Sequence, residues 1–369
     1  MSSSKLSVGI VGLPNVGKST LFNALLKRQV ALAANYPFAT VDPNTGIVEV
    51  PDKRLEKLRN VVESNEGVVP PLKPAVIEFV DIAGLVAGAS KGEGLGNKFL
   101  ANIRECDLIC HVLRAFEDGD VVLTGKMNPT EDLETIRTEL ILKDMETVER
   151  VRSTKYKVQS IKEKELRDRV MERLATCLGS GKMANSLVFD DDELEIIRDL
   201  HLLTLKPEIF VVNVSEEQLK NQRNEIRVKL VDELKSENVV VISAKIEGEI
   251  ASLDDEDQSL FMEELGIEES GVERMARAAY VKLGLISFLT AGKIECRAWT
   301  VRSGALAPEA AGVIHSDFSK KFIKAQVIGW EDFVQLGGWK KAREVGKVRM
   351  EGKEYVMRDG DVVEFMIGA

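Results

Sequence analysis

The stretch of sequence that decides the fold is Gly12-Leu13-Pro14-Asn15-Val16-Gly17-Lys18-Ser19. Its spacing is G-x-x-x-x-G-K-[ST], and it lies between an apolar strand-like segment, 6–11, and a helix-like segment, 19–26. The two glycines let backbone N–H groups converge on phosphate oxygens, and the positive end of the following helix adds to the attraction. The pattern predicts a phosphate-binding loop; the alternative is a glycine turn beside a solvated Lys18.

In such a loop the lysine and the final hydroxyl have separate tasks. Lys18 is expected to reach the β- and γ-phosphates of a nucleoside triphosphate, while the Ser19 hydroxyl ligates Mg²⁺. The residues of this stretch expected to bind the nucleotide are Asn15, Val16, Gly17, Lys18, Ser19 and Thr20. Mg²⁺ is therefore the expected cofactor.

A second chemical element is Asp81-Ile82-Ala83-Gly84, which follows an apolar strand predicted over 75–80. Because α/β sheets bind ligands at the carboxyl ends of their strands, Asp81 is expected to hold Mg²⁺ through water and the Gly84 amide to face the γ-phosphate. Thr40, between the two elements, is the third residue expected at the Mg²⁺ ion. The alternatives are an ordinary turn for the tetrapeptide and a plain surface threonine.

The apolar segments alternate with helical patterns through much of the chain. Further strands are predicted over 108–113, 209–212 and 239–242, and a short helix is predicted around 99–104. Strands that alternate with helices indicate an α/β fold with a mainly parallel sheet.

Two regions break this alternation. Residues 129–204 are helical in pattern and rich in charge, with no Gly or Pro over 131–174, which predicts a helical hairpin or short coiled coil inserted in the sheet domain. After about Leu285 a small α+β domain is expected, with strands over 297–301, 353–357 and 362–365 and a turn over 358–361. The predicted domains are a nucleotide-binding domain over 1–128 and 205–284, the helical insertion over 129–204, and the C-terminal domain over 285–369.

The composition restricts the class of protein. A chain of 369 residues is expected to form two or three domains, and its 44% of hydrophobic residues suffices for a real core. The net charge of −10 argues against nucleic-acid binding over the whole surface, and no sequence-specific DNA binding is expected. Four cysteines without a metal-binding pattern are expected to be reduced. With no signal peptide or membrane span recognised, a cytoplasmic protein is expected.

The residues expected to contact the base differ from those of a conventional GTPase. Such an enzyme carries N-K-x-D after a later strand, whereas this chain has Asn213-Val214-Ser215-Glu216, in which Val replaces the Lys and Glu replaces the Asp. A displaced carboxylate weakens the paired hydrogen bonds that select guanine, while the Asn213 amide can still bond to an adenine edge. ATP is therefore the expected substrate. The expected base-contacting residues are Asn213, Val214, Glu216, Ser243 and Ala244.

Several segments together resemble the YchF (Obg-like) ATPase family, which belongs to the translation-factor-related P-loop GTPases. The matching segments are 12–20, 35–46, 81–85, 88–96, 213–216, 298–300 and 310–315. The resemblance implies an ATP-preferring enzyme with Asn213 on adenine, the Val214 backbone beside it, and Ser19 and Thr40 on Mg²⁺. It also implies a coiled coil inserted in the nucleotide domain, a C-terminal ubiquitin-like TGS domain, and association with the ribosome.

The residue after the second element bears on the mechanism. Ras-like enzymes place there a Gln that orients the attacking water, but this chain has Leu85, which makes no hydrogen bond through its side chain. Slow hydrolysis is therefore expected, and the catalytic positions are Lys18, Asp81, Gly84 and Leu85. The resemblance suggests a loop histidine as a substitute, yet segment 117–126 contains none, and His111 is expected to be structural.

Further expectations concern ions and partners. Asn15 raises the hypothesis of a K⁺ ion beside the phosphates, in place of an arginine finger. The glycine-rich run 88–96 is either a switch segment or a flexible connector. Lysine-rich clusters in the C-terminal domain and the helical insertion permit contact with the large ribosomal subunit or the whole ribosome, although ordinary solvated faces explain them equally well. Three functions stay open: an ATPase switch, a conventional GTPase, and an RNA-binding scaffold with negligible turnover.

Overall fold

The computed structural model describes residues 6–33, 44–82, 95–116, 128–153 and 161–368, and it divides into two compact units. The larger unit comprises residues 6–47 and 78–275. The described part of the smaller unit comprises residues 48–77 and 276–368.

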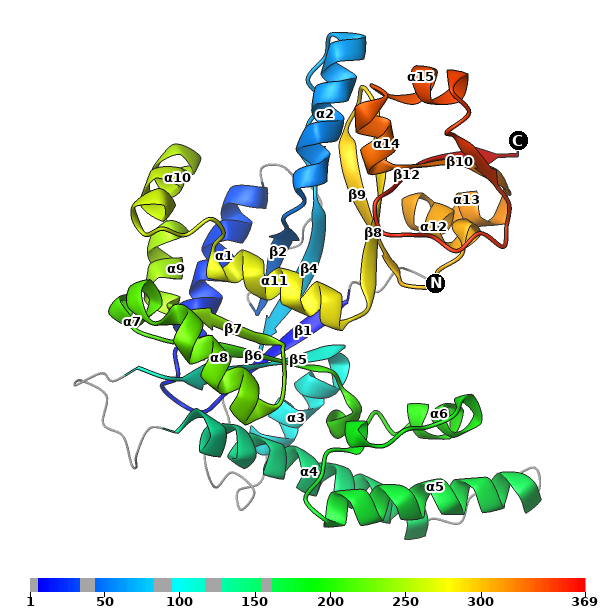
Figure 1. The fold of residues 1–369 in the computed structure, drawn as a ribbon. Coiled ribbons are helices and arrows are strands. Elements are labelled where there is room, and N and C mark those ends of the chain that lie inside the picture. The colour runs from blue at the N-terminus through cyan, green and yellow to red at the C-terminus, as the bar shows by residue number, and fades with distance from the viewer. Residues whose placement is uncertain (1–5, 34–43, 83–94, 117–127, 154–160, 369) are drawn as a thin grey trace. The chain divides into compact units, whose positions relative to one another are not determined.

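The larger unit is built on a six-stranded sheet in the order β2-β4-β1-β5-β6-β7 (Figure 1). Its strands are β1 (Ser7–Val11), β2 (Thr45–Val50), β4 (Ala75–Asp81), β5 (Leu108–Arg114), β6 (Glu208–Asn213) and β7 (Val239–Ile242). Strand β1 pairs in parallel with β4 and β5, β5 pairs in parallel with β6, and β6 with β7. The prediction of an α/β fold with a mainly parallel sheet is confirmed.

Burial explains why these segments form central strands. Every residue of β5, β6 and β7 is buried, as expected for parallel strands that are covered on both faces. The helices that accompany the sheet are α1 (Lys18–Ala33), α3 (Leu95–Glu105), α7 (Glu216–Asn221), α8 (Arg223–Leu234), α9 (Ala244–Ile250), α10 (Asp255–Glu264) and α11 (Gly271–Lys282). Helix α1 is longer at both ends than the segment predicted over 19–26.

The region between β5 and β6 is helical, as predicted. It contains α4 (Pro129–Ser153), α5 (Ile161–Gly179) and α6 (Asp191–Arg198), with short 3₁₀ turns at η2 (Ala184–Ser186) and η3 (Leu203–Leu205). Leu140, Val148, Val170 and Leu174 share one buried apolar cluster, which joins α4 to α5. The buried Asp144 carboxylate accepts hydrogen bonds from the backbone N–H groups of Leu203 and Thr204, at 3.0 and 2.7 Å, and so ties the returning chain to α4.

The smaller unit has its own six-stranded sheet, in the order β11-β10-β12-β8-β9-β3. Its strands are β3 (Leu72–Lys73), β8 (Leu285–Ala291), β9 (Cys296–Arg302), β10 (Phe322–Gly329), β11 (Arg349–Glu351) and β12 (Asp361–Ile367). Its helices are α2 (Lys53–Glu66), α12 (Ala307–Ile314), α13 (Ser316–Lys320), α14 (Trp330–Gln335) and α15 (Trp339–Glu344). The sheet is mixed, because β8–β9 and β10–β12 are antiparallel while β12–β8 and β3–β9 are parallel.

The strand predicted over 353–357 is wrong. Among the described residues this segment forms an isolated bridge between Val356 and Leu306. The Tyr355 carbonyl accepts from Ala307 and the Met357 N–H donates to Ala305, both at 2.9 Å. The alternation of its side chains had suggested a strand. The backbone beside this segment, however, leads directly into a helix, so there is no second strand with which it could pair.

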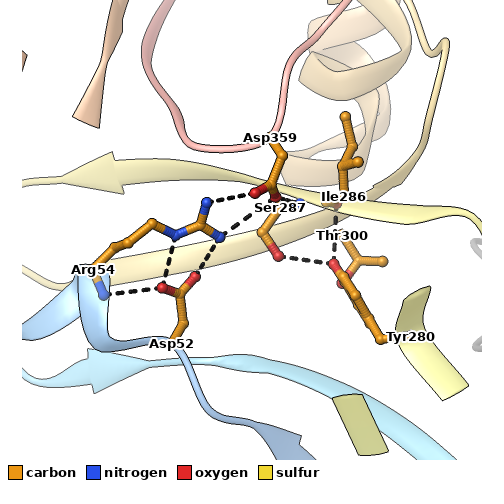
Figure 2. A network of polar contacts seen from close by, with 7 residues as sticks. All are labelled: Asp52, Arg54, Tyr280, Ile286, Ser287, Thr300 and Asp359. Atoms are coloured by element: carbon orange, nitrogen blue, oxygen red, sulfur yellow. Dashed lines mark hydrogen bonds and ion pairs between the residues drawn. The ribbon is translucent and has the colours of Figure 1, made fainter. Parts of the chain in front are cut away.

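Helix α2 and strand β3, which the sequence analysis did not single out, belong to the smaller unit although they are inserted between β2 and β4. Arg54 near the start of α2 bonds to Asp52 at 2.7 Å and to Asp359 at 2.7 Å (Figure 2). The Asp359 carboxylate also accepts from the Ser287 backbone N–H at 2.9 Å. The turn before β12 is therefore fixed to both α2 and β8.

Membrane spans and cysteines can also be examined in the structure. None of the helices in the described ranges is long and apolar enough to cross a membrane. All four cysteines are buried and free of disulfide bonds.

Candidate nucleotide site

The predicted phosphate loop joins β1 to α1 at the carboxyl edge of the larger sheet. Its backbone needs glycine at two positions for different reasons. A Cβ on Gly12 would lie 2.6 Å from the Val112 carbonyl oxygen, because the loop crosses close to β5. Gly17 has φ of +96°, and a Cβ there would lie 2.2 Å from the Asn213 amide nitrogen. Both glycines are therefore required by the local geometry.

Lys18 begins helix α1, and its ammonium group folds back over the loop. Its Nζ donates to the Gly12 and Leu13 carbonyl oxygens at 2.8 and 2.6 Å. Burial lowers the pKa of Lys18, and the nearby negative charge of Asp81 opposes this shift. Ser19 and Thr20 are exposed on the first turn of α1. The loop thus presents one cation and two hydroxyl groups at a helix N-terminus.

Asp81 ends β4 directly beside β1, where it is the register partner of Ile10. Burial raises the pKa of Asp81, while the positive charge of Lys18 lowers it. The two groups therefore influence each other electrostatically, while the predicted role of Asp81 at Mg²⁺ stays a prediction. The Asp81 carboxylate and the Ser19 hydroxyl are hard oxygen donors of the kind that bind Mg²⁺ together with nucleotide phosphates, so the residues present fit this ion. No cluster of three or more His, Cys, Asp or Glu side chains suited to a metal occurs among the described residues.

Asn213 ends β6 and connects three separate segments. Its Nδ2 donates to the Val16 carbonyl oxygen at 3.0 Å, and its Oδ1 accepts from the Ala244 N–H at 2.9 Å. The side chain is 4% exposed, so these bonds are shielded from water. Asn213 therefore fixes the phosphate loop to the Ser243–Ala244 loop, a role that the sequence pattern did not reveal. One N–H and one lone pair of the amide remain for a ligand, so the predicted adenine contact is still a prediction.

The other predicted base-contacting residues lie around the same edge. Val214 is buried, with its N–H donating to the Ile242 carbonyl at 2.8 Å, and Ser243 and Ala244 are buried beside it. Glu216 instead is exposed in α7 and pairs with Lys220 at 3.2 Å. A hollow of about 520 Å³ lies between α1 and α9, with Thr20 and Lys245 in its lining.

Three predicted site residues, Thr40, Gly84 and Leu85, lie outside the described residues, as do segments 88–94 and 117–126. Their predicted roles remain expectations.

His111 is a structural residue, as predicted. It is fully buried in β5, and its Nε2 contacts the Glu208 carboxylate at 2.8 Å while its ring stacks on Phe210. Arg137 of α4 bonds to the same carboxylate at 2.6 Å. Burial alone would raise the pKa of Glu208, but its bonds to His111 and Arg137 lower it to about 2. This network attaches α4 to the sheet.

The fold and the loop define the class: a phosphate-binding-loop nucleotide-binding protein with a helical insertion. Residues 7–156 match a family described as 50S ribosome-binding GTPase, and residues 285–368 match the YchF-GTPase_C family, described as a protein of unknown function. The chain is 50% identical over 366 residues to a Bacillus subtilis protein named ribosome-binding ATPase YchF, with 98% of each chain covered. A Haemophilus influenzae protein of the same name is 51% identical over 360 residues, covering 97% of this chain and 98% of the relative.

A solved structure agrees with these sequence comparisons. The Schizosaccharomyces pombe YchF GTPase has a TM-score of 0.85 and 35% identity to this chain, with 99% of each chain covered. The chain belongs to the YchF family.

Proposed function

We propose that this protein is a Mg²⁺-dependent ATPase that works as a nucleotide-state switch and binds the ribosome. The proposal rests on the geometry of the phosphate loop. The Gly17 backbone lies close to the Asn213 side chain, and the Lys18 ammonium group bonds back onto the loop. Relatives that match almost the whole chain are named ribosome-binding ATPases, which supports the activity and the partner.

Each site residue has a defined part in this proposal. The Gly17 and neighbouring amides bind phosphate oxygens, and Lys18 exchanges its carbonyl partners for the β- and γ-phosphates. Asn15, Val16 and Thr20 complete the wall of the phosphate site. Bound Mg²⁺ would neutralise phosphate charge, held by Ser19 and by Asp81 through water, with Thr40 and the Gly84 amide as the further predicted contacts.

A preference for ATP over GTP is the second part of the proposal. Glu216 stands where a GTPase has its guanine-binding Asp, and it is turned to solvent and paired with Lys220. Val214 is buried and offers only backbone groups. We propose that Ser243 and Ala244 support the base while the remaining amide hydrogen of Asn213 reaches adenine.

Turnover is proposed to be slow because Leu85 replaces the Gln that orients water in Ras-like enzymes. A K⁺ ion near Asn15 is proposed as a source of positive charge. Comparison of turnover in K⁺ and Na⁺ buffers tests this part, and equal rates would remove it.

The ribosome contact is proposed to use the C-terminal domain, 285–369, as a ubiquitin-like TGS domain, together with the insertion, 129–204, as a coiled coil. The remaining segments, 1–128 and 205–284, are proposed to carry the nucleotide site, although residues 48–77 and 276–284 within them group with the smaller unit. The protein is proposed to act in the cytoplasm. Co-sedimentation with ribosomes across a salt series tests the contact, since association through basic clusters weakens as salt rises.

Competition between ATP and GTP for the purified protein tests the proposal most directly. We expect tighter ATP binding, loss of binding in Lys18→Ala, and slow multiple-turnover phosphate release from ATP. Tighter GTP binding would instead indicate a conventional GTPase, consistent with the GTPase names among the matches. Binding without phosphate release would indicate a nucleotide-stabilised scaffold.

A further inference from the structure

The first turn of α11, which belongs to the larger unit, binds the helix that leaves the 243–244 loop. Glu247 lies on this helix, α9, and is 1% exposed. Its carboxylate accepts hydrogen bonds from the backbone N–H groups of Gly271 and Val272, at 2.7 and 3.2 Å. N–H groups in the first turn of a helix have no acceptor within that helix, so Glu247 satisfies both. Helix α9 is therefore attached to α11 shortly after the loop.

The same turn of α11 also contacts the strand that leads into the loop. A Cβ on Gly271 would lie 2.5 Å from the Ile242 Cγ2 and 2.7 Å from the Glu247 Oε1, so this close packing requires glycine. Arg274 donates from its Nη2 to the Val241 carbonyl oxygen at 2.9 Å. Val241 and Ile242 are the last two residues of β7. Helix α11 thus contacts the chain directly before the loop as well as after it.

Positive charge accompanies the buried carboxylate. Burial raises the pKa of Glu247, and this shift is opposed by the charge of Arg28, by the two backbone hydrogen bonds and by the charge of Arg274. Arg28 comes from α1, the helix that Lys18 begins, and it also pairs with Glu273 of α11 at 3.5 Å. Separation of these groups would leave a buried charge and two backbone N–H groups without partners, which is costly. The arrangement therefore holds α9 and α11 in one position.

We infer that Glu247 and Gly271 are positioning residues that set the 243–244 loop against the base of the bound nucleotide. The inference rests on the proposed function, in which this loop supports the base while the phosphate loop binds the phosphates. Asn213 bonds to Ala244 within the loop, and the first turn of α11 contacts the residues before and after it. A displaced loop loses its contacts to the base but not those to the phosphates. These residues consequently govern the part of the affinity that the base contributes.

The test separates the base from the phosphates. Isothermal titration at constant free Mg²⁺ measures the binding of a non-hydrolysable ATP analogue, and competition with this analogue measures the binding of inorganic tripolyphosphate. In Glu247→Ala, affinity for the analogue should fall about tenfold or more, while affinity for tripolyphosphate should stay within about threefold of the wild type.

Two other variants probe the same contact. Glu247→Gln keeps one acceptor oxygen for the Gly271 N–H and should lose less affinity for the analogue than Glu247→Ala. In Gly271→Ala the new Cβ meets Ile242 and the Glu247 carboxylate, so α11 is pushed away while the sequence of α9 is unchanged. The same selective loss of affinity for the analogue is expected.

Asp144→Ala is the matched control. Asp144 is likewise a buried carboxylate that accepts from two successive backbone N–H groups, those of Leu203 and Thr204, but it lies in the helical insertion. Its replacement should reduce stability and leave both affinities within about twofold of the wild type. Circular dichroism confirms that each variant is folded.

Two results would overturn the inference. One is an equal loss of affinity for the analogue and for tripolyphosphate in Glu247→Ala. The other is an affinity for the analogue in Glu247→Ala and Gly271→Ala that is no lower than in Asp144→Ala. Either would show that the contact supports the fold without positioning the loop. The proposed function fails separately, because its failure appears as absence of ATP binding by the wild type.

Discussion

The close approach of Gly17 and Asn213 predicts a strong energetic coupling between two residues far apart in the chain. Asn213→Ala leaves the buried Val16 carbonyl and Ala244 N–H without their partners. At roughly 1–3 kcal/mol for each of the two unsatisfied groups, the expected loss of unfolding free energy is about 2–6 kcal/mol. ATP affinity should fall as well, because the phosphate loop loses its attachment to the 243–244 loop.

Gly17→Ala should break the same two hydrogen bonds and lower the unfolding free energy further than Asn213→Ala does. The new Cβ would lie 2.2 Å from the Asn213 nitrogen and 3.3 Å from its Cγ, so the amide must turn away and both hydrogen bonds break. The φ of +96° adds about 1–2 kcal/mol for any residue with a Cβ. The expected total is roughly 3–8 kcal/mol. In the double variant, removal of Asn213 costs little more, because its bonds are already lost.

The assay is denaturant unfolding followed by far-ultraviolet circular dichroism. Tryptophan fluorescence is unsuitable here, because Trp299, Trp330 and Trp339 all belong to the smaller unit. The expected coupling energy between the two changes is about 2–6 kcal/mol, well above the few tenths found for independent sites. Additive losses in the double variant would refute the reasoning, since they would mean that the Asn213 bonds survive beside a Cβ at position 17.

Two further predictions concern ion pairs, one in each unit. The pKa of Glu208 is lowered from 4.5 to about 2 in the folded protein, so its contribution, about 3 kcal/mol, is present above pH 4.5 and is lost as the pH falls towards 2. Stability measured by circular dichroism across this pH range should fall in the wild type, and the stability of Glu208→Gln should depend less on pH. In the smaller unit, Arg54→Ala removes the bonds to Asp52 and Asp359 and should cost roughly 1–2 kcal/mol by tryptophan fluorescence. The exposed Lys53→Ala on the same helix should stay within about 0.5 kcal/mol of the wild type, and equal effects would contradict the role of Arg54.

The parts of the fold that could be predicted are those encoded by neighbouring residues. Strand β7 has the predicted bounds, and β5 and β6 differ from the prediction by one residue at one or both ends, because continuous apolar runs mark buried parallel strands. The phosphate loop was equally visible, since its glycine spacing is local. The bond between Asn213 and Val16 spans 197 positions, and no local pattern reports which distant backbone an amide will meet.

The predicted strand at 353–357 and the overlooked helix α2 share a cause. A strand exists only where a second strand is available, and the neighbour of Val356 is Leu306, directly before α12. Helix α2 follows β2 in the chain, yet Arg54 and Asn65 bond to Asp359 and Gly337, about 300 residues later. From its amphipathic pattern alone, such a helix would be assigned to the same unit as its neighbours in sequence. Only its hydrogen bonds to residues far along the chain show that it belongs to the smaller unit.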